Sequence, residues 1–322
     1  MLIRSKDIST AVVIVSYNGA PWIRGCVQSV AESPGDVHVI VVDNASTDGT
    51  ARIVETEFPL VELMALRHNV GFGRGNNIGI KRALALGARY VLLLNQDAVM
   101  TPGALAKLQR YMDAEPAVGV CTPLHCSPDS SRLDVRTYRN YVAPHAGGLL
   151  LDALRGNVGR SYEIPGINAA VWFVRADTFR TVGGFDPLFF MYGEDDDLLS
   201  RMRFHRVRFA LLPNVVAVHL RQSPARQKGT WLHELRILVG RDRATLLMRV
   251  KDPGFSTLFS LRVLVSWGLV RPVADLLLSS DWKQCLASWW AAWRVLLEFN
   301  RVRRHALTTR TRGAHFLDEP AG

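Results

Sequence analysis

The sequence predicts an α/β fold in which helices cover both faces of a mostly parallel sheet. Over roughly the first 120 residues, short apolar runs alternate with amphipathic helical patterns, and polar residues follow several of the runs directly. Runs that are apolar throughout are typical of strands buried on both faces, as in parallel sheets. From residue 231 onward the pattern is helical throughout, which predicts a C-terminal helical segment behind the α/β part.

Each apolar run is paired with a helical stretch. The expected strands cover 11–15, 37–43, 61–66, 90–94 and 118–122, and the expected helices cover 21–33, 45–58, the second half of 73–87, and 101–114. Cap residues support two of the helix starts: Ser46, Thr47 and Asp48 for the second, and Thr101 followed by Pro102 for the fourth.

Periodicity is lost over 127–165, so we expect a long, mobile loop region there, of the kind that is often functional in a compact domain. Order returns at 167–179. The expected domains are therefore an α/β domain over 1–230 and a helical, basic region over 231–322.

Composition bounds the possible partners. The chain has 322 residues, 48% of them hydrophobic and 21% charged, which is enough for a real core. The net charge of +10 suggests a phosphate-bearing partner, either a nucleotide, a nucleic acid or an anionic membrane. The four cysteines fit no zinc framework, and Cys121 and Cys126 are expected to form a thiol pair in a loop.

No secretory leader or membrane span is expected. The first apolar run has only five residues, and no stretch of about 18 uninterrupted apolar residues appears. These patterns predict a cytoplasmic protein.

Polar residues stand at the carboxyl ends of the first, second and fourth strands, where ligands bind on parallel sheets. Asp43 is explained either by turn chemistry or by a hydrogen bond to a nucleotide base or ribose. Asp97 is either a turn residue or a ligand for a divalent cation on a polyphosphate. His219, at another strand end, is either structural or a nitrogen ligand of the same ion.

A glycine-rich stretch, VGFGRGNNIGI, covers 70–80. Its backbone N–H groups could cradle phosphates, and Arg74, Asn76 and Asn77 add donors. The spacing is not that of the dinucleotide fingerprint, and alone it is a weak signal.

The stretch FFMYGEDDDLLSR, residues 189–201, places four acids after an apolar run. At a helix N-terminus such charges interact favourably with the dipole, which is a structural explanation for the cluster. Helical spacing points Asp196 to the polar face and lets Asp197 pair four residues on, so both are expected on the solvent side. Asp195 shares a face with the apolar residues that follow, where burial raises a carboxyl pKa and suits a general base.

Tryptophans gather near the C-terminus, at 289, 290 and 293, and a basic tail follows at 301–312. Trp-rich amphipathic helices with basic flanks favour contact with a membrane surface. The alternative is a helical cap that buries these residues in the core or in a subunit interface.

Taken together, the motifs at 12–18, 39–50, 68–80, 92–98 and 182–203, followed by His219, occur in an order that resembles the inverting family 2 glycosyltransferases with the GT-A fold. The similarity covers roughly residues 10–222, and it is strongest to bacterial rhamnosyltransferases that build cell-surface glycans.

The resemblance implies a role for each matching residue. Asp195 would be the catalytic base, Asp97 and His219 would hold Mg²⁺ or Mn²⁺, and Asp43 would bind the base of the nucleotide. On the acceptor side it places Phe190, Tyr192 and Glu194, with Phe189 and Met191 in the same wall. The residues implied at the donor site are Ser16, Asn18, Asp43, Asn44, Gly71, Asn76, Asn77, Asn95, Gln96 and Asp97.

Two positions depart from the family pattern. Asn95 replaces the first acid of the DxD motif, which leaves one carboxylate for the metal, and Asn76 stands where many members have Arg. The expected reaction is inverting transfer of L-rhamnose from dTDP-rhamnose to a glycan or a polyprenyl-diphosphate-linked acceptor at the inner membrane face. Alternatives are a UDP-galactofuranose or UDP-hexose transferase, and a non-catalytic nucleotide-sugar-binding homologue. No nucleic-acid reader motif is present, and a nucleotidyltransferase would need a different first loop.

Overall fold

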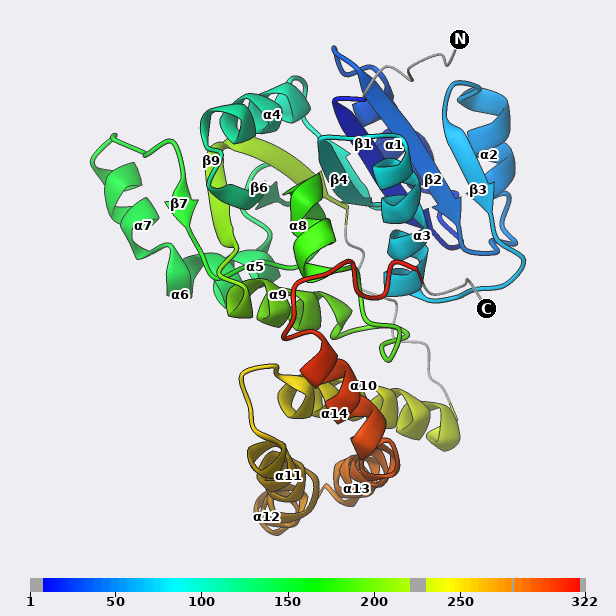
Figure 1. The fold of residues 1–322 in the computed structure, drawn as a ribbon, viewed down its shortest axis with the longest axis vertical. Helices are drawn as coiled ribbons and strands as arrows, with labels where there is room; N and C mark the ends of the chain where they lie inside the picture. Colours follow the sequence, from blue (N-terminus) through cyan, green and yellow to red (C-terminus); the bar gives the residue numbers. More distant parts are fainter. Residues whose placement is uncertain (1–7, 221–229, 280, 319–322) are drawn as a thin grey trace.

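The computed structural model describes residues 8–220, 230–279 and 281–318, and nine strands in these residues form one sheet (Figure 1). The strands are β1 (Thr10–Ser16), β2 (Val37–Asp43), β3 (Glu62–Ala65), β4 (Tyr90–Asn95), β5 (Ala98–Met100), β6 (Val118–Cys126), β7 (Tyr162–Glu163), β8 (Val171–Arg175) and β9 (Arg208–His219). Their order is β3-β2-β1-β4-β8-β6-β9-β5, and β7 pairs with β9.

The N-terminal half of the sheet is parallel, as expected, and the other half is mixed. Strands β3, β2, β1 and β4 all run in the same direction. β8 lies antiparallel between β4 and β6, and β5 is antiparallel to β9. The carboxyl ends of β1, β2 and β4 therefore meet at one edge, as the alternating pattern predicted.

Helices α1 (Ile23–Ala31), α2 (Thr50–Glu57), α3 (Phe72–Ala85), α4 (Ala104–Ala114), α8 (Ala176–Val182) and α9 (Glu194–Phe204) cover the sheet. Two of the expected helix starts were placed too early. α2 begins after Gly49 and α4 after Gly103, both in the left-handed region that glycine adopts without strain. Thr101 therefore does not cap α4, while Asp48 accepts hydrogen bonds from Thr50.

The segment 127–165 is not a single long loop, so that expectation was wrong. It contains α5 (Val135–Thr137), the π-helical turn η1 (Tyr138–Val142), α6 (Ala143–His145), α7 (Gly147–Leu154) and β7. These pieces are too short to show a helical period in the sequence. The expected loop thiol pair was also wrong, because Cys121 and Cys126 are buried in β6.

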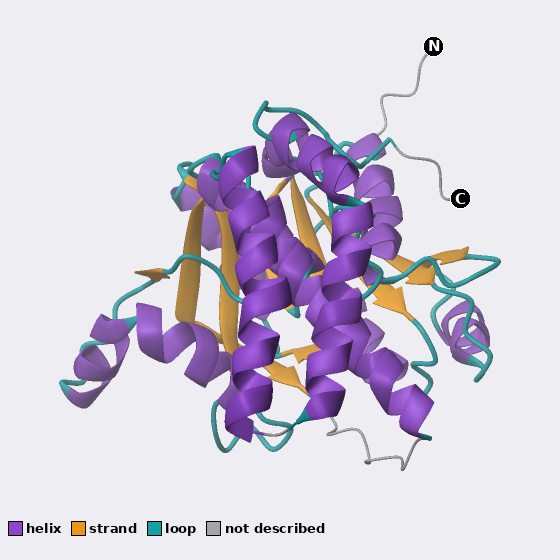
Figure 2. Ribbon diagram, turned by 90° about the horizontal axis from the view of Figure 1, so that it is seen from below, coloured by secondary structure: helices purple, strands orange, loops and turns teal. Residues whose placement is uncertain are grey.

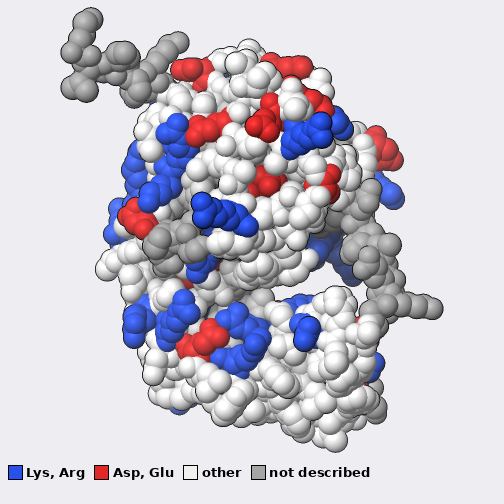
Figure 3. Space-filling model, turned by 90° about the vertical axis from the view of Figure 1, so that its right-hand side faces the viewer, with Lys and Arg blue, Asp and Glu red and all other residues white. Residues whose placement is uncertain are grey.

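Helices α10 (Trp231–Lys251), α11 (Thr257–Val265), α12 (Arg271–Ser279), α13 (Trp282–Leu297) and α14 (Phe299–Thr308), with the π-helical turn η2 (Ser266–Val270), form the C-terminal part below α9. Figure 2, seen from below, shows two long helical rods side by side in front of the strands. In Figure 3 the charged atoms of this lower part lie mostly toward the α/β part, and its lower edge is largely white.

One helical stretch in the described residues, Thr257–Ala274, is long and apolar enough to cross a membrane by length and composition alone, although it contains no uninterrupted apolar run of that length. The stretch is continuous because helix α11 leads through η2 directly into α12, and neither Arg262 nor Arg271 ends the helix.

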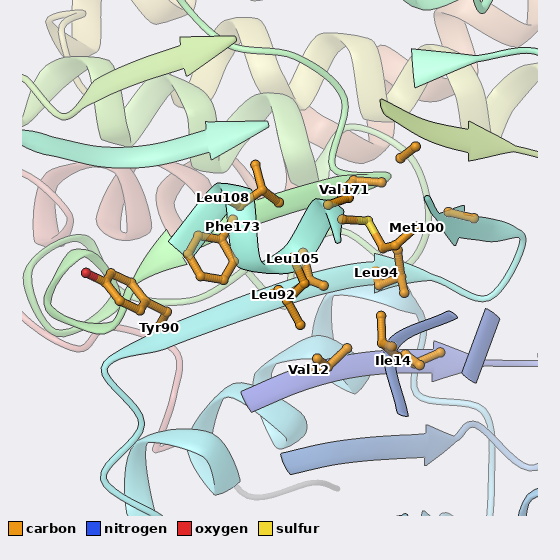
Figure 4. Packing of buried hydrophobic residues seen from close by; sticks show 14 of the residues in the cluster. Val12, Ile14, Tyr90, Leu92, Leu94, Met100, Leu105, Leu108, Val171 and Phe173 are labelled. Atoms are coloured by element: carbon orange, nitrogen blue, oxygen red, sulfur yellow. The ribbon is translucent and has the colours of Figure 1, made fainter. Parts of the chain in front are cut away.

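The core has a layer on each face of the sheet and a third cluster below. Figure 4 shows the first layer, which contains Ile14, Leu92 and Phe173 of the sheet together with Leu105 of α4. The third cluster joins Leu188 and Phe189 to buried residues of α10, α13 and α14. The chain then returns to the α/β part, where Gly313 N–H donates to the Thr181 carbonyl and Leu317 is buried.

Candidate functional site

The carboxyl ends of β1 and β4 are tied together by Gln96. The Ser16 hydroxyl donates to Gln96 Oε1 at 2.6 Å, and the Tyr17 N–H donates to the same oxygen at 3.0 Å. Gln96 Nε2 returns a bond to the Tyr17 carbonyl. Ser16 and Gln96 thus shape this edge of the sheet.

Asp43 ends β2 directly beside Ser16 and is almost fully buried. Its Oδ2 accepts a bond from the Ser46 N–H at 3.0 Å, which is the turn chemistry that was one of the two alternatives for this residue. Its buried Oδ1 has no hydrogen-bond partner, and such an atom normally costs free energy. A ligand N–H or hydroxyl placed there would satisfy it.

The neighbouring amides hold the loops around Asp43. Asn44 accepts from the Val70 N–H and donates to the Gly71 carbonyl, and Asn18 accepts from the Thr47 N–H at 2.9 Å. These side chains fix the donor-side loops through their own bonds.

The glycine-rich stretch serves close packing. A Cβ on Gly71 would lie 2.3 Å from the Phe190 carbonyl oxygen, and Cβ atoms on Gly75 and Gly79 would press into Val15 and Val13 of β1. Glycine lets α3 approach the sheet this closely.

Asn76 and Asn77 are also engaged within the fold. Asn76 donates to the Phe72 carbonyl, while Asn77 donates to the Phe185 and Phe316 carbonyls and accepts from the Phe185 N–H. Both side chains are buried. Their role in donor binding stays a prediction, and in this structure Asn77 connects α3 to the C-terminal return.

Asp97 and His219 come together from different strands. Asp97 follows β4, His219 ends β9, and Asp97 Oδ1 lies 3.3 Å from His219 Nε2. His219 is 4% exposed, and its Nδ1 has no hydrogen-bond partner. Asn95 Oδ1, two residues before Asp97 at the end of β4, is also buried without a hydrogen-bond partner.

A carboxylate oxygen and an imidazole nitrogen at this separation fit a divalent cation such as Mn²⁺ or Mg²⁺. Within 8–220, 230–279 and 281–318, no group of three or more His, Cys, Asp or Glu forms a metal cluster.

The four acids form the first turn of α9, as expected, but Asp197 is not on the solvent side. It is 3% exposed and pairs with Arg201 Nε at 2.9 Å and with Lys251 Nζ at 2.5 Å. Lys251, from α10, also lies 2.9 Å from Asp186. The expected pair with Arg201 exists, but it lies inside the molecule because α10 covers it.

Asp195 is aimed at the start of β8. Its Oδ2 accepts from the Ala169 N–H at 3.4 Å, and its Oδ1 accepts from the Asp196 N–H. The next residue, Ala170, accepts a bond from the Asn95 N–H at 2.9 Å. Two consecutive residues thus connect the acid helix to the strand end that precedes Asp97.

Burial governs the protonation of these acids. It raises the pKa of Asp195, and it raises that of Asp196 to about 6, with the charge of Asp195 adding to the effect. Glu194 is the most perturbed of the three: burial and the Asp195 charge raise its pKa to about 8, and its buried Oε2 has no partner.

Glu194→Gln is expected to flatten the pH dependence of the unfolding free energy between about pH 4.5 and 8. The pKa of Glu194 is about 8 in the fold, against an ordinary value of 4.5. Its contribution to the free energy of unfolding is therefore fully present below pH 4.5. That stability is lost as the pH rises through 8, because the unfolded chain releases the proton first. Urea unfolding across this range measures the slope. Glu55→Gln, an exposed change on α2, is the control, and an unchanged slope in Glu194→Gln would contradict the raised pKa.

The four apolar and aromatic residues 189–192 before α9 differ in exposure. Phe190, Met191 and Tyr192 are exposed, and the Phe190 carbonyl accepts a bond from the Phe72 N–H of α3. Phe189 instead packs in the third core cluster, so its expected place in an acceptor wall was wrong.

Three residues near the site carried no signal in the sequence. Asn168, next to Ala169, has a buried Oδ1 without a partner. Burial raises the pKa of Asp195 and Asp196, and the charge of Arg136 on α5 partly offsets that rise. Lys251 is the third. A lone Arg or Asn in an aperiodic segment, or a Lys at the end of a helix, looks like any surface residue in a sequence.

Comparison with known proteins identifies the family of the chain. The model of "Glycosyl transferase family 2" matches residues 11–182, and that of "N-terminal domain of galactosyltransferase" matches residues 153–222. The chain is 28% identical over 216 residues to an N-acetylglucosaminyl-diphospho-decaprenol L-rhamnosyltransferase of Mycobacterium tuberculosis, covering 59% of this chain and 69% of that protein. It is 32% identical over 120 residues to the dTDP-rhamnosyl transferase RfbF of Shigella flexneri, covering 37% and 39%.

Solved structures share the fold. S. aureus TarS 1–349 superposes with a TM-score of 0.56 at 14% identity, covering 94% of this chain and 89% of that one. The mannosyltransferase PcManGT from Pyrobaculum calidifontis, in complex with GDP-Man and Mn²⁺, gives a TM-score of 0.53 at 18% identity, covering 94% and 84%.

Proposed function

We propose a specific reaction for this chain, which belongs to glycosyl transferase family 2 and is a nucleotide-sugar-dependent glycosyltransferase of polysaccharide synthesis. The reaction is transfer of L-rhamnose from dTDP-rhamnose, with inversion, to a glycan or a polyprenyl-diphosphate-linked acceptor. The Mycobacterium and Shigella relatives are both named as rhamnosyltransferases, which supports the sugar, and the name of the former also supports a lipid-linked acceptor.

One observation carries the assignment of the site. Asp97, which pairs with His219, follows Asn95, whose N–H donates to the Ala170 carbonyl. Asp195 accepts a bond from the N–H of Ala169, which precedes Ala170. The two acids are therefore connected through two consecutive residues. A group bound at Asp97 would therefore be held just after the end of β4, and an acceptor at Asp195 would lie near the start of β8, which pairs with β4.

On the donor side, the partnerless Oδ1 of Asp43 would accept the imide N–H of thymine. Asp97 and His219 would hold Mg²⁺ or Mn²⁺, which stabilises negative charge on a departing diphosphate. With a single carboxylate in this pair, binding of the ion should depend strongly on the nucleotide.

On the acceptor side, Asp195 takes the proton of the attacking hydroxyl. A bond forms between that oxygen and the anomeric carbon as the bond to the nucleoside diphosphate breaks on the opposite face, which inverts the centre. The raised pKa of Asp195 makes it a stronger base than an exposed carboxylate. Exposed Phe190 and Tyr192 would flank the acceptor.

A thermal-shift comparison tests the donor. We expect dTDP-rhamnose with Mn²⁺ to raise the unfolding midpoint, since a ligand at about 100 times its Kd adds about 2.7 kcal/mol of stability. Asp97→Asn should lose the Mn²⁺-dependent part of the shift. The exposed Asp177→Asn on α8 serves as the control and should keep it. A larger shift with UDP-galactofuranose or a UDP-hexose would overturn the donor assignment.

A further inference from the structure

The C-terminal helices expose two apolar rows. On the helix from Thr257 to Ser279, one row contains Leu258, Leu261, Val265, Leu269, Val273 and Leu277, and Leu277 is 80% exposed. The spacing of these residues keeps them on one side of the helix. In Figure 3 the lower edge of the molecule, where these helices lie, shows few charged atoms.

The second row lies on α13 and is rich in tryptophan. It contains Trp282, Leu286, Trp289, Trp290, Trp293 and Leu297, with Trp290 and Trp293 each 60% exposed. Together the two rows are called the apolar face below. Isolated exposed apolar residues are normal, but two adjacent rows mark an interaction surface.

The apolar face is not a core surface that lacks its own partner. Helix α13 already buries Ala287, Ala291 and Val295 on its other side, where it packs against α10. Only 22% of the apolar stretch Thr257–Ala274 is buried, whereas the core helix of a soluble protein is mostly buried. The outward rows are therefore an additional surface.

The charge around the apolar face is positive. Among the described side chains of 257–308, the exposed cations are Arg262, Arg271, Arg294, Arg301 and Arg304, and the exposed carboxylate is that of Asp281. A second copy of the chain would place like charges opposite one another. An anionic surface would be attracted.

We infer that the apolar face docks on an anionic lipid bilayer and lies in its interface. Indole rings are favoured at the boundary between headgroups and acyl chains, and exposed arginines pair with lipid phosphates. A spanning arrangement would place Arg262 in hydrocarbon and separate the helix from α13. Docking itself does not depend on the proposed reaction; only its use, holding the enzyme at a lipid-linked acceptor, rests on that function.

Flotation of the full chain with lipid vesicles tests the inference. We expect binding to phosphatidylcholine vesicles that contain phosphatidylglycerol, weakened by salt, and little binding to phosphatidylcholine alone. The triple variant Trp289→Ser, Trp290→Ser, Trp293→Ser should bind at least about tenfold more weakly, because it removes apolar area that the bilayer would bury.

A matched triple variant on α7, Leu150→Ser, Leu151→Ser, Leu154→Ser, also removes exposed apolar side chains and should bind as the unmodified chain does. Unfolding curves establish that both variants fold. The inference is overturned if the unmodified chain ignores anionic vesicles or if the tryptophan variant binds equally well. A solution dimer that the tryptophan variant converts to monomer would also overturn it. Vesicle binding needs no nucleotide, and the donor thermal shift needs no vesicle, so failure of one inference is distinguishable from failure of the other.

Discussion

Asp195→Asn is expected to lower the turnover number by about 10²- to 10⁴-fold, the range that a positioned general base contributes. Asn keeps the size of the side chain and can still accept the bond from the Ala169 N–H. It cannot take the proton of the acceptor hydroxyl. Initial transfer rates at saturating donor measure the loss, and the donor-induced thermal shift should be unchanged.

Asp196→Asn is the matched control, because it removes a carboxylate from the same helical turn. Its turnover should stay much nearer to that of the unmodified enzyme. The base must be deprotonated to act, so turnover should fall as the pH drops through a pKa above the ordinary aspartate value of about 3.9. An Asp195→Asn enzyme that works within a few-fold of the unmodified one would show that another group accepts the proton.

Lys251→Met is expected to destabilise the fold by about 3–5 kcal/mol, the cost of removing one partner from a buried ion pair. Lys251 is fully buried between Asp186 and Asp197, which are buried as well. Burial alone would raise the pKa of Asp186, but the charges of Lys251 and His305 hold it below its usual range. Urea unfolding at neutral pH measures the loss.

Two comparisons isolate the charge effect of Lys251. Arg180→Met breaks an exposed pair with Asp177 and should cost no more than about 1 kcal/mol. Adding Asp197→Asn to Lys251→Met should recover part of the stability, since a neutral amide is less costly to bury than an unpaired charge. A Lys251→Met chain as stable as the Arg180→Met chain would rule out a structural role for the buried lysine.

The sequence predicted best where the signal is local. Apolar runs ending in polar residues located β1, β2 and β4, and therefore the edge where Ser16 and Asp43 meet. The antiparallel direction of β8 could not be found, because a strand buried on both faces has the same apolar run in either direction. The short strand β5 left no pattern at all.

Side-chain contacts between residues far apart in the chain were the least predictable from the sequence. Asp197 was correctly paired with Arg201 four residues on, but its burial depends on Lys251, 54 residues later. The bonds from the Asn77 amide to the Phe185 and Phe316 carbonyls could not be predicted either, because these residues lie far along the chain. The glycines of α3 are explained by the approach of Val13 and Val15, which only the packed structure reveals.

Because Lys251 follows Asp186 and Asp197 in the sequence, their pairing must wait during synthesis on the ribosome. Asp186 and Asp197 emerge well before Lys251 and His305, which neutralise them, and Leu188 and Phe189 emerge before α10 and α14, which cover them. A nascent chain that has released only the α/β part therefore holds two carboxylates and two large apolar side chains still in water. The turn leading into the acid helix is therefore covered only after the C-terminal helices have been made.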